Sequence, residues 1–218
     1  MEIKAVIFDF DGVIAETEGV HRLAWIALAE DLSRPLPEGF LDRGIGSTMD
    51  KLAWELYEFW EGAVDLQEIH DEKANHFRRL LAETKDVLVG GVIEAFQTFH
   101  QMGLPMGIAT SSPRREIEPL LETHAVKDLF QSIVTLDCVD NPKPHPEAYL
   151  RSVANLKQQP ENCLVFEDSI LGTTAARAAG TNVVGVLTSF PREKLEPLID
   201  AIDHFHQLPQ VLKKLRME

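Results

Sequence analysis

The sequence has few cysteines and few basic residues, and each shortage excludes a class of protein. Only two cysteines occur, Cys138 and Cys163, and their spacing supports neither a disulfide framework nor a zinc site. Lysine and arginine total 21 against 35 acidic residues, which gives a formal net charge of -14. Nucleic-acid affinity depends on clustered basic side chains, so no nucleic-acid partner is expected. An acidic chain that binds an anionic ligand would have to supply positive charge locally.

Long apolar segments are also absent. The longest purely apolar runs, such as residues 183–187, are a few residues long, whereas a bilayer-spanning helix needs about 20. The first residues, Met-Glu-Ile-Lys, lead directly into a strand-like segment without the basic and apolar regions of a signal peptide. We therefore expect a cytoplasmic protein with no membrane partner. Its 218 residues, 44% of them hydrophobic, suffice for one substantial core and a smaller second lobe.

Short strand-like and helical patterns alternate along most of the chain. Apolar or β-branched runs bounded by turn signals predict strands at residues 3–8, 105–109, 132–135, 163–166 and 182–186. Helical patterns lie between the later runs, at residues 92–102, 113–123, 146–156 and 169–179. This alternation predicts an α/β fold with a doubly wound parallel sheet.

Residues 17–88 break this alternation. They show helical periodicity but no convincing strand, which predicts an inserted helical lobe. We expect its aromatic residues to form its own core: Trp25, Trp54, Tyr57, Phe59 and Trp60. The predicted organisation is an α/β core of residues 1–15 and 90–218 and a helical cap of residues 17–88. The hinges would lie in the two short connections, the second of which contains Gly90 and Gly91.

The segment Asp9-Phe10-Asp11-Gly12 directly follows the first predicted strand. Two carboxylates at positions i and i+2 of a loop can point toward one spot, and Gly12 lets backbone N–H groups curl around an anion. The same pattern also occurs in calcium-binding loops and in simple turns. An EF-hand is excluded, because Val13 and Val20 would occupy its fifth and twelfth positions, where oxygen ligands are needed.

Three further polar segments follow predicted strands: Thr110-Ser111-Ser112, Asn141-Pro142-Lys143-Pro144 and Glu167-Asp168-Ser169. Taken singly, each has an ordinary structural interpretation. The first could be a helix cap, the second a surface loop, and the third a cap with acidic residues that match a helix dipole. In an open α/β sheet, however, ligands bind outside the carboxyl ends of the strands. All four segments would therefore meet at one place, which predicts a functional site there.

The four segments together resemble the motifs of the haloacid dehalogenase superfamily, in its β-phosphoglucomutase-like group. The matching stretches are Asp-Phe-Asp-Gly-Val-Ile-Ala-Glu-Thr from Asp9, then Thr110, then Lys-Pro-His-Pro-Glu-Ala-Tyr from Lys143, and Glu167-Asp168-Ser169-x-x-Gly172. The segment His21-x-x-Ala24-Trp25 resembles the start of the family's helical cap. This resemblance spans most of the chain and implies a Rossmann-like core with an inserted cap that closes over the site.

The resemblance also implies roles for individual residues. Asp9 would attack phosphorus to give an aspartyl phosphate, and Asp11 would first protonate the leaving oxygen and then act as a base. Thr110 would donate a hydrogen bond to the phosphoryl oxygens, and Lys143 would neutralise their charge. Mg²⁺ would be held by Asp9, the backbone carbonyl of Asp11 and Asp168, with Glu167 either a direct ligand or one acting through water.

A wider set of residues is expected to contact the substrate: Gly12, Ser111, Ser112, His21, Ser47, Lys73 and Arg114. His21 matches a histidine at the cap entry of the resembled family, where it lies near the acid/base aspartate. Packing of His21 at the hinge is the alternative interpretation.

The expected function is hydrolysis of a small phosphate monoester, a sugar phosphate or similar metabolite. A mutase of the β-phosphoglucomutase type is the alternative. The family's mutases carry a cap-loop arginine for the second phosphate, whereas Gly44-Ile45-Gly46-Ser47-Thr48 has serine at that place. Arg43, Lys73 or Arg114 could supply the missing charge. A catalytically silent binding module on the same fold is the third hypothesis. Loss of the nucleophile, the acid/base aspartate or the metal-binding acid would mark such a module, and none is lost.

Overall fold

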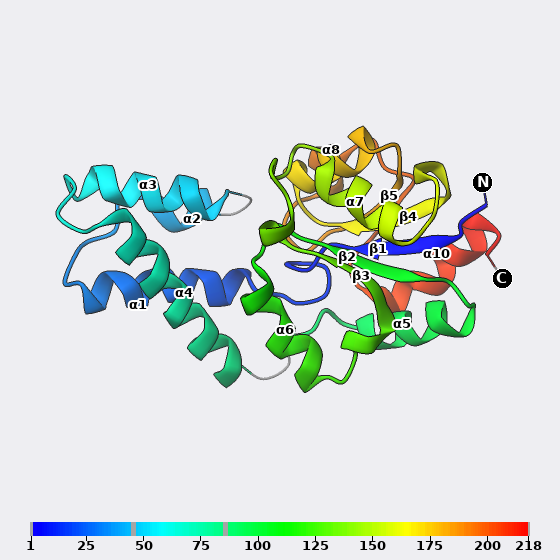
Figure 1. The fold of residues 1–218 in the computed structure, drawn as a ribbon, viewed down its shortest axis with the longest axis horizontal. Coiled ribbons are helices and arrows are strands. Elements are labelled where there is room, and N and C mark those ends of the chain that lie inside the picture. Colours follow the sequence, from blue (N-terminus) through cyan, green and yellow to red (C-terminus); the bar gives the residue numbers. More distant parts are fainter. Residues whose placement is uncertain (1, 45–46, 85–86, 218) are drawn as a thin grey trace. The chain divides into compact units, whose positions relative to one another are not determined.

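The structure is a computed structural model that describes residues 2–44, 47–84 and 87–217 (Figure 1). The chain divides into two compact units, one of Met1–Glu16 with Leu88–Glu218 and the other of Thr17–Val87. The predicted division was 1–15 with 90–218 against 17–88. The predicted loop positions Ile45 and Gly46 lie outside the described residues, as do residues 85–86 of the second connection.

The first unit is built on a sheet of six parallel strands in the order β3-β2-β1-β4-β5-β6. The strands are β1 Ala5–Phe8, β2 Met106–Ala109, β3 Phe130–Val134, β4 Cys163–Glu167, β5 Asn182–Val186 and β6 Asp200–Ile202. The strand order reverses at β1, whose two neighbours are β2 and β4. In doubly wound sheets, ligands bind outside the carboxyl ends of the strands at such a reversal.

Helices cover both faces of this sheet. They are α5 Val92–Gln101, α6 Arg114–Thr123, α7 Glu147–Asn155, α8 Ile170–Ala178, α9 Arg192–Leu195 and α10 Leu208–Leu215. In Figure 1, α5, α6 and α10 lie on one side of the strands, while α7 and α8 lie on the other. Right-handed crossover connections require the covering face to change when the strand order reverses. The predicted fold class, an α/β doubly wound parallel sheet, is confirmed.

The two faces of β1 lead into two different cores because alternate side chains of a strand point in opposite directions. Phe8 packs among aromatic rings, stacked on Phe166 at 5.3 Å and edge-to-face with Phe96 at 5.1 Å between centroids. Ile7 belongs to an aliphatic core that includes Val165 and the fully buried Tyr149. Both faces of β1 and β4 are therefore buried, which explains the continuous apolar runs at residues 5–8 and 163–166.

The second unit is entirely helical among its described residues. Its helices are α1 Glu18–Asp31, α2 Phe40–Gly44, α3 Met49–Phe59 and α4 Leu66–Glu83. Trp25 and Trp60 are buried in its core, in agreement with the expectation for this lobe, and Tyr57 packs against that core. Trp54 and Phe59 were wrongly assigned to it, since they are 50% and 48% exposed. Trp54 lies on the side of α3 opposite the buried Leu52 and stacks on Tyr57 at 5.3 Å, and Phe59 is the last residue of the helix.

Besides short 3₁₀ turns, one strand and two α-helices in the described part of the sheet unit were not predicted: β6, α9 and α10. A strand of only three residues such as β6 is too short to show an alternating pattern, and α9 has only four residues. No helix in the described part of the chain is both long and apolar enough to cross a bilayer.

Candidate active site

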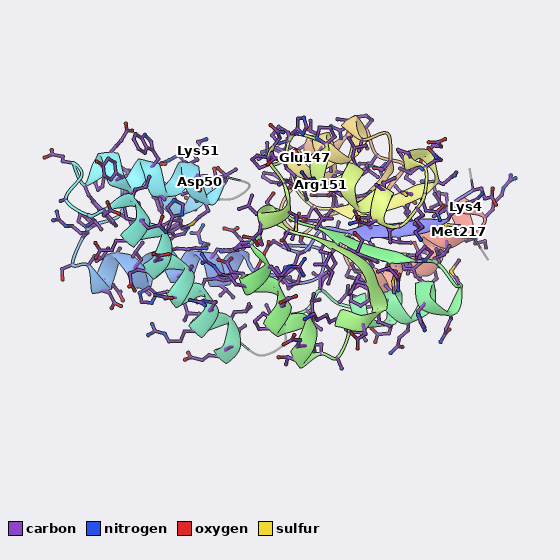
Figure 2. The ribbon with its side chains drawn as sticks, in the orientation of Figure 1. Lys4, Asp50, Lys51, Glu147, Arg151 and Met217 are labelled. Carbon is purple, nitrogen blue, oxygen red and sulfur yellow. The ribbon has the colours of Figure 1, made fainter. Side chains whose placement is uncertain are left out.

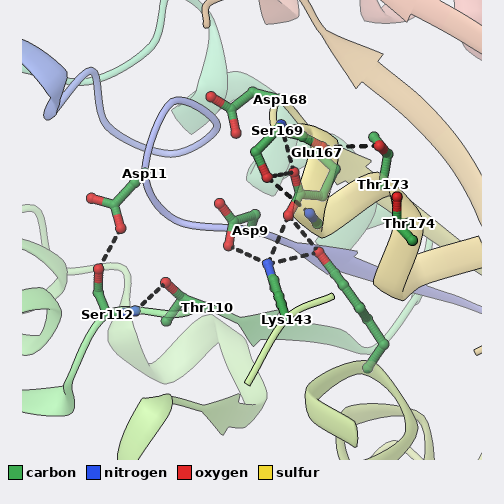
Figure 3. Close-up of polar contacts among 12 residues, drawn as sticks. Asp9, Asp11, Thr110, Ser112, Lys143, Glu167, Asp168, Ser169, Thr173 and Thr174 are labelled. Carbon is green, nitrogen blue, oxygen red and sulfur yellow. Dashed lines mark hydrogen bonds and ion pairs between the residues drawn. The ribbon is translucent and has the colours of Figure 1, made fainter. Parts of the chain in front are cut away.

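Strand pairing places the acidic residues of the site at one level. Phe8 pairs with Phe166 in the register of β1 and β4, so the next residues, Asp9 and Glu167, leave the two strands side by side. The backbone N–H of Asp9 continues the ladder by donating to the Phe166 carbonyl at 3.0 Å. Asp168 follows directly. Figure 3 shows Asp9, Glu167 and Asp168 gathered around the carboxyl ends of these strands.

Lys143 reaches this cluster from the loop that precedes α7. Its ammonium group donates to Asp9 Oδ1 at 2.7 Å, to Glu167 Oε1 at 2.7 Å and to the Tyr149 hydroxyl at 3.0 Å (Figure 3). These three bonds use all three N–H donors of the ammonium group. Lys143, Asp9 and Glu167 are all buried. Lys143 thus brings a positive charge into the buried acidic cluster.

Glu167 has hydrogen-bond partners on both carboxylate oxygens. Oε1 accepts from Lys143 and from the Tyr149 hydroxyl at 2.9 Å, and Oε2 accepts from the Ser169 N–H at 2.8 Å and its hydroxyl at 3.1 Å. A carboxylate offers about four acceptor positions, so these donors fill them. Gly172 makes this arrangement possible, because a Cβ there would lie 1.5 Å from Glu167 Oε1.

Burial and mutual repulsion change the acidity of the cluster. Burial, opposed by Lys143, raises the pKa of Asp9 to about 8, with added repulsion from Glu167 and Asp11. Burial, followed by repulsion from Glu167 and Asp9, raises the pKa of Asp168 well above its ordinary value. Burial alone would lower the pKa of Lys143, but the carboxylates of Asp9 and Glu167 outweigh it and raise that pKa. The single positive charge of Lys143 therefore does not neutralise the negative charge that Asp9, Glu167 and Asp168 would carry together.

The cluster fits a divalent cation. Asp9, Glu167 and Asp168 each offer a carboxylate oxygen, and these oxygens lie within 4.8 Å of one another. Hard oxygen donors suit Mg²⁺ and Ca²⁺, and the excess of buried negative charge favours a cation. Although Glu167 is close enough to take part, its acceptor positions already bind protein donors. Asp9 and Asp168 are the better side-chain ligands on this ground.

The second aspartate of the first loop is held by an unexpected partner. Ser112 donates a short hydrogen bond from Oγ to Asp11 Oδ2, and its backbone N–H donates to the Thr110 hydroxyl at 3.0 Å (Figure 3). Thr110 is buried at the end of β2, and its hydroxyl hydrogen can still be donated to another acceptor. Ser112, which was expected to contact substrate, contacts Asp11 in the structure.

Other residues expected to bind substrate have different environments. The Arg114 guanidinium donates to the Ile133 carbonyl at 2.9 Å and pairs with Glu118 at 3.0 Å. This arrangement directs Arg114 to the surface of α6 and does not bring it to the acidic cluster. Ser111 is exposed in the loop after β2. Gly12 has φ of +73° and lies against the Asp168 carboxylate.

The expected cap residues belong to the helical unit. Lys73 is buried, and its Nζ lies 2.7 Å from His21 Nδ1, while the His21 ring stacks on Phe77 at 4.1 Å. Ser47 donates its hydroxyl to the Arg43 carbonyl at 2.6 Å. Arg43 itself pairs with Glu55 and donates to the Glu38 carbonyl at 2.8 Å.

Sequence reasoning missed three residues of the sheet unit that complete the cluster: Tyr149, Thr188 and Ser189. Tyr149 contacts Lys143 and Glu167, as described above. Thr188 and Ser189 follow β5 and contact the other loops, Thr188 donating to the Gly12 carbonyl at 2.6 Å and Ser189 to Asp168. Tyr149 stands in the stretch from Lys143 that resembles a family motif, which was an available signal. The signal for Thr188 and Ser189 was their position after a predicted strand, which is shared by many ordinary turns.

Comparison with known proteins decides the family. The family model described as haloacid dehalogenase-like hydrolase matches residues 6–186. The chain belongs to this family. It is 33% identical over 208 residues to protein CbbY of Rhodobacter capsulatus, covering 88% of each chain. It is also 33% identical over 192 residues to a phosphorylated carbohydrates phosphatase of Thermotoga maritima, covering 86% of this chain and 87% of the relative.

A solved relative shares the whole architecture. The crystal structure of β-phosphoglucomutase from Clostridium difficile superimposes with a TM-score of 0.80 at 25% identity, covering 99% of this chain and 100% of the other. The predicted resemblance to the β-phosphoglucomutase-like group is therefore confirmed. So is the predicted enzyme class, a phosphohydrolase of the haloacid dehalogenase-like family. Family enzymes of this kind generally use a divalent metal, in keeping with the acidic cluster.

Proposed function

We propose that this enzyme is a Mg²⁺-dependent phosphatase that hydrolyses a small phosphorylated carbohydrate through an aspartyl phosphate on Asp9. The observation that carries the proposal is the buried contact of Lys143 with Asp9 beside Asp168. In this proposal Asp9 is the nucleophile, Lys143 is the neighbouring positive charge and Asp168 is a metal ligand. The similarity to a phosphatase of phosphorylated carbohydrates supports the substrate class.

In the proposed first step, an Asp9 carboxylate oxygen bonds to phosphorus while the bond from phosphorus to the ester oxygen breaks. Asp11, as a carboxylic acid, gives its proton to the leaving oxygen. The hydrogen bond from Ser112 to Asp11 Oδ2 would hold this carboxyl group in place for the transfer. In the second step, water attacks the phosphorus of the aspartyl phosphate while Asp11 accepts the water proton, and phosphate and Asp9 are released.

The remaining residues would control charge and position. Thr110 would donate its hydroxyl hydrogen to a phosphoryl oxygen, and Lys143 would neutralise the carboxylate of Asp9. Mg²⁺ held by Asp9, Asp168 and the Asp11 backbone carbonyl would supply the positive charge that draws in the phosphoryl group and stabilises its transfer. We assign Glu167 to the positioning of Lys143, because its acceptor positions are already filled.

Residues 17–87 would act as a cap that selects the substrate, with His21, Ser47 and Lys73 as its candidate contacts. A mutase must also bind the second phosphate of a bisphosphate intermediate, usually through an arginine in the cap. Ser47 offers one neutral hydroxyl, and Arg43 is already paired with Glu55. Lys73, whose Nζ lies 2.7 Å from His21 Nδ1, is the remaining cation of this set. If it does not bind the second phosphate, bisphosphate binding would fall about ten- to a hundredfold, from a loss of roughly 1.5–3 kcal/mol. These contacts favour hydrolysis over isomerisation.

The proposal is tested by incubating the enzyme and Mg²⁺ with a panel of phosphorylated carbohydrates and measuring free phosphate. Asp9→Asn should abolish phosphate release, because an amide cannot form the acyl phosphate. Asp11→Asn should lower it by about 10²–10⁴-fold, the usual contribution of general acid–base catalysis. Asp128→Asn, at an exposed position, is the matched control and should retain activity. Near-normal turnover by Asp9→Asn would refute the assignment.

A separate assay decides between phosphatase and mutase. The enzyme is given β-glucose 1-phosphate with catalytic bisphosphate, and glucose 6-phosphate and free phosphate are measured together. We expect phosphate release to exceed isomerisation. Dominant glucose 6-phosphate formation would show that the helical unit anchors a second phosphate after all.

A further inference from the structure

The turn after β5 contacts two of the loops that build the acidic cluster. Ser189 donates a short hydrogen bond from its hydroxyl to Asp168 Oδ2. Its neighbour Thr188 donates to the Gly12 carbonyl at 2.6 Å and lies 3.4 Å from the same Asp168 oxygen. Neither residue belongs to the motifs that identified the family. The carboxyl ends of β1, β4 and β5 are thus joined by side-chain hydrogen bonds.

Asp168 is packed tightly into this junction. Its side chain is buried, and a Cβ on Gly12 would lie only 2.0 Å from Oδ2. The carboxylate therefore rests directly against the backbone of Gly12, at a residue whose φ of +73° favours glycine. With one oxygen held by Ser189 and covered by Gly12, Oδ1 is the oxygen left to bind a cation.

We infer that Ser189 and Thr188 are positioning residues for the divalent cation site. Ser189 fixes the rotation of the Asp168 carboxylate. Thr188 fixes the Gly12 carbonyl and, through it, the short loop that carries the Asp11 backbone carbonyl. The inference rests on the proposed function, which makes Asp168 and the Asp11 carbonyl metal ligands. It adds the turn after β5 to the four polar segments that the proposed function already uses.

The expected size of the effect follows from the behaviour of outer partners in metal sites. Removing a residue that orients a ligand typically lowers metal affinity by about 10–100-fold. Ser189→Ala leaves a buried carboxylate oxygen without its short hydrogen bond, so Mg²⁺ affinity should fall within that range. Thr188→Val removes the bond to the Gly12 carbonyl and should also weaken Mg²⁺ binding.

The test is a titration of the full chain with Mg²⁺ alone. Calorimetry gives the dissociation constant for Mg²⁺, and the rise in melting temperature gives a second measure of binding. Wild type, Ser189→Ala, Thr188→Val and Asp168→Asn are compared. Thr174→Ala is the matched control. It removes an exposed hydroxyl whose hydrogen-bond partners, Ile170 and Arg177, both lie in α8. Its Mg²⁺ affinity should equal that of wild type.

The outcomes separate this inference from the function on which it rests. If wild type binds Mg²⁺, Asp168→Asn loses it and Ser189→Ala and Thr188→Val bind as tightly as wild type, the positioning assignment is overturned and the proposed metal site stands. If wild type and Asp168→Asn behave alike, the proposed metal site itself fails. Should Ser189→Ala not fold, as judged by circular dichroism without Mg²⁺, Thr188→Val decides the question alone.

Discussion

At the scale of single residues, the Tyr149 hydroxyl forms hydrogen bonds with two charged groups of the acidic cluster. The Tyr149 hydroxyl accepts from Lys143 and donates to Glu167, and its ring lies 4.7 Å from the Lys143 nitrogen. Burial and the nearby Glu167 raise the pKa of Tyr149 well above its usual range, so this hydroxyl keeps its proton. Tyr149 thereby links the Lys143 ammonium group to the Glu167 carboxylate.

We predict that Tyr149→Phe lowers the free energy of unfolding by about 1–3 kcal/mol, because two buried charged groups each lose a hydrogen-bond partner. Urea unfolding monitored by circular dichroism measures this change. Tyr57→Phe, in the helical unit, is the control and should unfold at nearly the wild-type urea concentration. A Tyr149→Phe variant as stable as wild type would show that the hydroxyl contributes nothing to the cluster.

Gly172 belongs to the same scale, because an added methyl group there would overlap Glu167. The Cβ would lie 1.5 Å from Oε1 and 2.0 Å from the carboxyl carbon, and this carboxylate is held by four donors. Gly172→Ala should therefore destabilise the sheet unit by about 3 kcal/mol or more. Gly19→Ala is the matched control, because a Cβ added to Gly19 in α1 would meet no neighbouring residue within 4 Å. Its extra methyl should be neutral or stabilise by up to about 1 kcal/mol. Equal melting temperatures for the two variants would contradict the prediction.

At the scale of elements, the first turn of α7 holds the loop that carries Lys143. Glu147 accepts hydrogen bonds from the Asp140 N–H at 3.0 Å and from the Asn141 N–H at 3.0 Å, and it pairs with Arg151 at 2.6 Å (Figure 2). The Asp140 N–H, then the Asn141 side chain, lower the pKa of Glu147 to about 2. The carboxylate thus remains charged throughout the physiological pH range.

We predict that Glu147→Ala lowers kcat by about tenfold or more, because small displacements of a catalytic group are costly. Amide hydrogen exchange at Asp140 and Asn141 should become faster, and this readout does not depend on turnover. In wild type, protection from Glu147 should be complete above its unfolded pKa of 4.5 and should be lost only as the pH falls toward 2. Glu161→Ala, at an exposed position, is the control. Unchanged exchange in Glu147→Ala would contradict this assignment.

At the scale of the whole molecule, cation binding should couple to stability. The folded chain brings Asp9, Glu167 and Asp168 together, whereas the unfolded chain does not. A ligand that binds only the folded state stabilises it by about 2.7 kcal/mol when its concentration is 100 times the dissociation constant. We therefore predict that Mg²⁺ raises the melting temperature and that excess EDTA removes both this rise and phosphate release.

Calcium provides the matched comparison for Mg²⁺. It should also raise the melting temperature, because the same carboxylates can bind it. It should inhibit turnover, because its higher and looser coordination disturbs the alignment that phosphoryl transfer requires. Asp168→Asn should abolish most of the thermal effect of both ions. Full activity in excess EDTA would contradict the metal requirement.

The sequence alone determined the order of the strands β1 to β5 and of the helices α5 to α8, and it located the polar segments that carry the acidic cluster. Each of those signals is local: a short apolar run, a turn, then Asp9, Thr110, Lys143 or Asp168. Patterns of this kind depend on neighbouring residues, so they can be read without knowing the fold. The division into an α/β sheet and a helical insertion followed from the same periodicities, whereas the exposed positions of Trp54 and Phe59 did not.

Only the tertiary structure decided which atoms these residues contact. Ser112 reaches Asp11 across 101 residues, and Thr188 reaches Gly12 across 176. Such pairs are set by strand register and by the packing of side chains, which no local pattern encodes. For the same reason, the sequence left Glu167 open as a direct or indirect metal ligand. Two of its four protein donors belong to Ser169, two residues away, but the other two, Lys143 and Tyr149, reach Glu167 across 24 and 18 residues.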